Sequence, residues 1–98
     1  MIPINEFKSE VQHWAARVGV SPKEVHMRKM RRKWASCSAR GRLTFNYDLL
    51  REDLPTRNKV VLHELLHLRY PNHGKMFHSL LEAYTAEAAG VTSSRRIQ

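Results

Sequence analysis

The most constraining feature of this chain is an apolar run at 60–68 that carries three polar residues, His63, Glu64 and His67. The run is long enough for a largely buried helix, and a helix brings residues four positions apart onto the same face. Two imidazoles and a carboxylate are costly to bury without a partner, and a metal ion is a suitable one. The H-E-x-x-H spacing therefore predicts a helix that binds a metal ion through His63 and His67, with Glu64 beside it.

A catalytic zinc site has three protein ligands and one open position, so a third ligand is needed. His73 lies in a turn with Pro71 and Gly74, where a tight reversal can return a side chain to the first two histidines. His78 is the other candidate and lies farther along the chain. We expect His73 to be the ligand and His78 to be either a wall residue of the site or a partly buried polar residue. The alternative is an ordinary helix whose histidines are solvated or hydrogen-bonded and bind no metal ion.

Hydrophobic periodicity predicts one α+β domain over the whole chain, 1–98. Apolar residues at helical spacing indicate an N-terminal helix, the H-E-x-x-H helix and a C-terminal helix, at about 5–18, 57–69 and 75–89. Thr56 or Asn58 is the expected N-cap of the middle helix. The polar tail at 92–98 is expected to fray.

Extended segments lie between the first two helices. Alternating or extended patterns indicate three short strands, at about 25–28, 34–38 and 42–47, which we expect to pair as a small antiparallel sheet. Trp34 is expected in the core. Cys37 is expected to be a small buried hydrophobe; the alternatives are a further metal ligand and a redox-sensitive thiol.

Positive charge is concentrated in one part of the chain. The net charge is +8, and the segment 28–42 holds seven basic residues and no acidic one. Its densest part is a basic patch formed by Arg28, Lys29, Arg31, Arg32 and Lys33. Such a patch can contact nucleic acid or attract an acidic protein substrate. It can equally be a solvated edge that positive charge keeps soluble.

The remaining sequence features concern the compartment. The single cysteine, Cys37, allows no internal disulfide bond, which fits a reducing cytosol. Residues 1–6 have neither the basic start nor the apolar segment of a secretion signal. No segment approaches the roughly 20 apolar residues that a membrane span requires. We expect a cytoplasmic monomer that does not bind membranes.

Several motifs in order give the chain a family resemblance. They are Trp34-Ala35-Ser36-Cys37-Ser38, a strand that ends at Asn46, His63-Glu64-Leu65-Leu66-His67, and Asn72-His73-Gly74-Lys75-Met76-Phe77. In this order the chain resembles the YgjP-like metallopeptidases, which are minimal zincins related to the WLM and SprT-type proteases. The resemblance implies one Zn²⁺ bound by His63, His67 and His73, with Glu64 as the catalytic base. It also implies that the strand at 34–38 borders the cleft.

The resulting hypothesis is a zinc-dependent peptidase that acts on peptide or protein substrates through a zinc-bound water, with Glu64 as general base. Tyr70 and His78 are the candidates to stabilise the transition state. The alternative is a basic, zinc-stabilised module associated with nucleic acid. Such a module could be a protease that acts on DNA-bound proteins, or an inactive scaffold.

Overall fold

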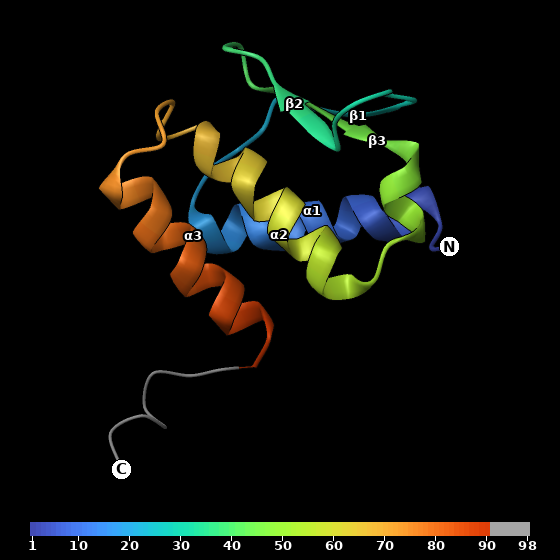
Figure 1. Cartoon of the computed structure of the whole chain (residues 1–98). Coiled ribbons are helices and arrows are strands. Elements are labelled where there is room, and N and C mark those ends of the chain that lie inside the picture. The colour runs from blue at the N-terminus through green and yellow to red at the C-terminus, as the bar shows by residue number, and fades with distance from the viewer. Residues whose placement is uncertain (91–98) are drawn as a thin grey trace.

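The computed structural model describes residues 1–90, so the expected tail at 92–98 lies outside them. The described part contains three α-helices, a 3-10 helix and three strands: α1 (Ile4–Val18), β1 (Glu24–Arg28), β2 (Ala35–Cys37), β3 (Arg42–Asn46), η1 (Tyr47–Arg51), α2 (Leu54–His67) and α3 (Lys75–Ala88). Figure 1 shows the sheet lying over α1 and α2, with α3 packed beside α2. The predicted α+β class and the three predicted helices are confirmed. Within residues 1–90, no helix has the length and apolar character that a membrane span needs.

The helix that carries the H-E-x-x-H motif begins earlier than expected. Asp53 is its N-cap, and a carboxylate oxygen of Asp53 accepts a hydrogen bond from the Thr56 backbone N–H at 2.9 Å. Pro55 lies in the first turn, where a proline costs no hydrogen bond. Thr56 and Asn58 therefore lie inside the helix, and the prediction that one of them caps it is wrong. Asn58 instead accepts a buried hydrogen bond from the Trp14 indole at 3.0 Å, which joins α2 to α1.

The sheet is mixed, and the prediction of a purely antiparallel sheet is wrong. Its strand order is β1-β3-β2, with β1 parallel to β3 and β2 antiparallel to β3. The chain reverses once between β1 and β2 and again between β2 and β3, so β3 runs in the direction of β1. Insertion of β3 between the other two strands then makes β1 and β3 parallel neighbours. β2 is left as an edge strand that contacts α2.

The hydrophobic core lies between the sheet and the helices. Its fully buried side chains come from every layer: Phe7, Val11, Leu43, Phe45, Leu49, Val61, Leu62, Leu65, Leu66 and Phe77. Phe7 of α1 packs edge-on against Phe45 of β3, with ring centroids 5.1 Å apart. Trp34 does not join this core, because 39% of its surface is exposed. That sequence prediction is wrong, and the position of Trp34 matters for the cleft described below.

A nearly buried ion pair fixes the start of α2 against α1. The Arg57 guanidinium donates to both carboxylate oxygens of Glu10, at 3.0 and 2.9 Å, and also to the backbone carbonyl of Glu52 at 2.8 Å. Arg57 is itself buried. Removal of one partner would leave the other charge in a poorly hydrated place without compensation. The pair therefore holds the helix that carries the H-E-x-x-H motif in its place.

We expect Glu10→Ala to lower the free energy of unfolding by about 3 kcal/mol, because it leaves the Arg57 charge buried and unpaired. Urea titration followed by circular dichroism measures this change. Arg17→Ala is the matched control, since it breaks the exposed ion pair with Glu87. An exposed pair contributes less than about 1 kcal/mol. Equal losses of unfolding free energy in the two variants would show that burial does not increase the contribution of the Arg57–Glu10 pair to stability.

Candidate metal centre

Two histidines lie side by side on α2. The ring centroids of His63 and His67 are 4.8 Å apart, as the spacing of four residues on a helix requires. Three leucines of the same helix, Leu62, Leu65 and Leu66, are fully buried and hold it against the core. The apolar residues thus fix the orientation of α2, and the two imidazoles lie on a less buried side of it.

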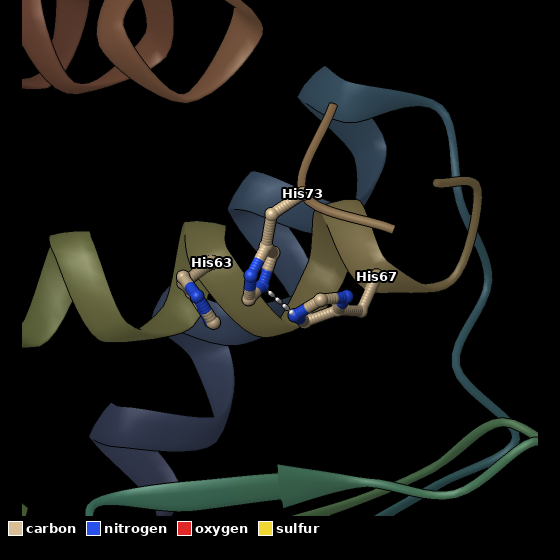
Figure 2. Close-up of side chains that lie close together, drawn as sticks. All are labelled: His63, His67 and His73. Atoms are coloured by element: carbon tan, nitrogen blue, oxygen red, sulfur yellow. Dashed lines mark hydrogen bonds between the residues drawn. The ribbon is translucent and has the colours of Figure 1, made fainter. Parts of the chain in front are cut away.

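The third histidine reaches the pair through the reversal after α2. The helix closes with hydrogen bonds from the Leu68 N–H to the Leu65 carbonyl and from the Tyr70 N–H to the Leu66 carbonyl. Pro71 then prevents further helix, and the chain turns back. Figure 2 shows His73 extending from this segment toward His63 and His67. The His73 ring centroid lies 4.6 Å from that of His67 and 5.2 Å from that of His63.

The three imidazoles can hold a metal ion. One ligand atom from each of His63, His67 and His73 lies within 4.8 Å of the others, and this is the only such group found among residues 1–90. Nε2 of His67 and Nε2 of His73 are 2.8 Å apart. Two nitrogens that each lie about 2.1 Å from a tetrahedral zinc ion are separated by roughly 3.4 Å. The nitrogens of His67 and His73 therefore lie closer together than a bound zinc ion would hold them, and three imidazoles would fill three of four tetrahedral positions.

The lowered pKa of His73 favours metal binding at this place. Loss of hydration lowers the pKa of His73, and repulsion from the neighbouring imidazoles, with His67 first, lowers it further. A metal ion requires neutral imidazole, so a lowered pKa keeps this nitrogen available at neutral pH.

Glu64 lies directly beside the three histidines. Its side chain is almost buried, with 8% of the residue exposed, and Oε2 lies 3.0 Å from Nδ1 of His63. A proton on Nδ1 satisfies this contact and leaves the Nε2 lone pair of His63 free for a metal ion. One carboxylate can therefore orient a ligand and at the same time face the centre.

Phe77 packs against all three histidines. Its ring centroid lies 5.2 Å from that of His63, 4.8 Å from that of His67 and 4.7 Å from that of His73. The residue is 1% exposed and belongs to the core through α3. The sequence motifs include Phe77, but sequence reasoning assigned it no role at the site. Its position four residues after His73 was the available signal that it also supports the site.

A cleft runs between β2 and α2 and has two parts. The larger, the turn-side hollow, has a volume of about 920 Å³ and is lined by Glu64 and His67 and by Ser36 and Cys37 of β2. The smaller, the tryptophan-side hollow, has a volume of about 490 Å³ and is lined by Trp34, His63 and Glu64 among others. Lys33, Ala35 and Glu64 line both hollows. His63, Glu64 and His67 thus lie along the cleft, with Glu64 in the wall of both hollows.

The other candidate residues lie at different distances from this centre. The His78 ring is exposed, and its centroid is 6.1 Å from that of His73. Tyr70 packs against the core, and the Arg69 guanidinium lies 5.7 Å from its ring centre. Cys37 is half-buried in the wall of the turn-side hollow, and burial raises the pKa of its thiol. The structure therefore places the His78 ring near that of His73, and Tyr70 against the core.

The basic patch is exposed and lies at the entrance to β2. All five of its members, Arg28, Lys29, Arg31, Arg32 and Lys33, are exposed at the end of β1 and in the connection to β2. The buried Asn46 holds this connection in place: its side-chain amide donates to the carbonyls of Met30 and Lys33 at 2.9 and 3.0 Å. Sequence reasoning did not assign Asn46 a role, although a polar residue at the end of a buried strand was a usable signal.

We expect Phe77→Leu to weaken zinc binding about tenfold or more, because the imidazoles lose the ring that orders them. Zinc titration against a competing chelator measures the dissociation constant. Phe7→Leu is the matched control, since it removes a fully buried ring on the far side of the core. A tenfold loss in both variants would indicate a general effect on stability and contradict the specific role of Phe77.

Known proteins show similarity to this chain in sequence and in fold. The family model described as YgjP-like, metallopeptidase domain, matches residues 4–93, which confirms the resemblance predicted from the motifs. No curated protein matched the chain. The fold is similar to the crystal structure of the metallopeptidase zymogen of Pyrococcus abyssi abylysin, with a TM-score of 0.69 and 21% sequence identity. That similarity covers 78% of this chain and 76% of the other. Because the family model covers nearly the whole sequence, the chain belongs to the YgjP-like metallopeptidase family.

Proposed function

We propose that this metallopeptidase uses one zinc ion, bound by His63, His67 and His73, and hydrolyses peptide bonds with Glu64 as general base. The observation that carries the proposal is the grouping of three imidazoles, with ligand atoms within 4.8 Å, beside a nearly buried carboxylate. Three nitrogen ligands and an open position are typical of a catalytic zinc ion, whereas a structural zinc ion has four protein ligands.

The residues of the chain divide the chemistry between them. A bound zinc ion supplies Lewis acidity, which polarises a carbonyl group and makes water more acidic. Glu64 accepts the proton of the attacking water and returns it to the amine that leaves. The contact between Glu64 and Nδ1 of His63 holds the carboxylate in one orientation before the substrate arrives. Tyr70 and His78 are the candidates for stabilising charge on the substrate oxygen, and the His78 ring lies near that of His73.

The edge strand β2 offers a way to bind the substrate. β2 pairs with β3 on one side only, and all three of its residues line the turn-side hollow. An extended peptide can add to such an edge through backbone hydrogen bonds. Backbone pairing requires an unfolded segment, so the substrates are flexible peptides or unstructured parts of proteins.

We expect Glu64→Gln to abolish peptide cleavage while zinc stays bound, because the amide keeps the shape of the carboxylate but accepts no proton. The expected loss of kcat is about 100-fold to 10,000-fold. The measurement is cleavage of an unfolded protein, with zinc content determined by elemental analysis. Equal cleavage by Glu64→Gln and the unchanged protein would remove Glu64 as the base.

We expect His73→Ala to lose the bound zinc ion and His78→Ala to keep it, because only His73 belongs to the group of three ligands. Elemental analysis of the purified variants, with circular dichroism as a check of folding, decides between the two histidines. Retention of one zinc ion per chain in a folded His73→Ala variant would exclude His73 as a ligand.

The exposed basic patch favours a second candidate function, nucleic-acid binding. A zinc-stabilised module that binds nucleic acid would use Arg28 to Lys33 for phosphate contacts and would need no catalytic base. Such a module would bind zinc and leave unfolded proteins intact. Its affinity for DNA would fall steeply as the salt concentration rises. A peptidase that also binds DNA would combine this salt dependence with cleavage that Glu64→Gln abolishes.

A further inference from the structure

The tryptophan-side hollow differs in character from the rest of the cleft. Its wall combines apolar side chains, Trp34, Ala35 and Val60, with the ammonium-bearing Lys33 and Lys59. It opens directly beside His63 and Glu64, so a group bound there would lie next to the reacting centre. Its volume of about 490 Å³ can accommodate a large side chain.

Trp34 is exposed in this hollow because its backbone is fixed there. Its carbonyl accepts a hydrogen bond of 2.8 Å from the Asn46 N–H, and the Asn46 side chain holds the carbonyl of the preceding Lys33. Its neighbour Ala35 is buried and paired with Phe45 in the sheet. The indole is therefore presented to the hollow by a rigid backbone. A fixed, half-exposed aromatic ring beside a reacting centre is suited to contact with a ligand.

The charged residues that line the cleft are mostly basic. Lys33 and Lys59 line the tryptophan-side hollow, Lys23 and Arg40 line the turn-side hollow, and Glu64 is the one carboxylate that lines either. Within residues 1–90, neither Lys33 nor Lys59 forms an ion pair. Carboxylates of a bound peptide can pair with these cations, whereas a basic peptide would be repelled.

We propose that the tryptophan-side hollow is a specificity subsite that binds a large apolar side chain next to the scissile bond, in substrates whose flanking residues are acidic. This inference rests on the proposed peptidase function and adds the class of substrate to it. Trp34 and Val60 contact the apolar side chain, and Lys33 and Lys59 attract the neighbouring carboxylates. The cut falls at a constant distance from the apolar residue, because the hollow and Glu64 are fixed relative to each other.

The first experiment compares two fluorogenic peptides that differ at one position, Phe or Gly, between acidic neighbours. We expect kcat/KM for the Phe peptide to be at least about tenfold higher. Trp34→Ala should remove most of this preference, so that the ratio of kcat/KM between the Phe and Gly peptides falls toward one. Tyr47→Ala is the matched control, since Tyr47 is an exposed aromatic residue that lines neither hollow. Mass spectrometry of the products should place the cut at one fixed offset from Phe.

The second experiment measures binding without turnover. The chain has two tryptophans, and Trp14 is 7% exposed and hydrogen-bonded to Asn58, so a ligand in the cleft should change the emission of Trp34 alone. In the zinc-loaded Glu64→Gln variant, we expect the Phe peptide to shift the emission to shorter wavelength and the Gly peptide to have no effect. Absence of a shift with the Phe peptide would overturn the subsite.

The third comparison tests the charge. Lys59→Glu should lower kcat/KM for peptides with acidic neighbours and raise it for peptides with basic neighbours. Lys8→Glu is the control, because Lys8 is an exposed lysine of α1 that lines neither hollow. Unchanged selectivity in Lys59→Glu would remove the acidic-substrate part of the proposal.

The outcomes separate this inference from the proposed function. If the unchanged protein cleaves the Phe and Gly peptides equally well, and Trp34→Ala does the same, the peptidase stands and the subsite is wrong. If no peptide is cleaved although zinc is bound, the proposed function fails. The fluorescence experiment then still decides whether the hollow binds apolar side chains.

Discussion

The contact of one phenylalanine ring with three imidazoles is the interaction on which the site depends. His63 and His67 are held by the buried face of α2, but His73 comes from an exposed turn with no secondary structure of its own. Phe77 provides a rigid apolar surface for all three rings and is anchored in the core. Because Phe77 is part of α3, the packing of α3 on α2 and the geometry of the metal centre cannot be separated.

The order of the strands determines what lies opposite the metal centre. With β3 between β1 and β2, the central strand is covered on both edges, and the short edge strand β2 contacts α2. An antiparallel meander in chain order would have placed β2 in the middle and left β3 at the edge. The mixed arrangement thus gives the cleft an edge strand that can pair with an extended chain.

Most local features of this protein could be predicted from its sequence, although the N-cap of α2 was not, and the pairing of the strands could not be predicted. The spacing of His63 and His67 follows from the helical repeat, and the turn at Pro71 and Gly74 pointed to His73. The pairing was missed because the alternation of apolar and polar residues shows which face of a strand is buried, but not which strand lies beside it. The exposure of Trp34 was missed for a related reason. A tryptophan looks like a core residue unless the elements that would cover it are known to leave a hollow.

The hydrogen bonds of Asn46 determine which neighbouring positions can be substituted without a change of the fold. This one side chain holds both ends of the segment from Met30 to Lys33 and also accepts the backbone N–H of Asp48 as the chain enters η1. The intervening residues, Arg31 and Arg32, contribute no side chain to the core. Substitution of these two arginines should therefore change the charge of this surface while the hydrogen bonds of Asn46 and the core stay the same.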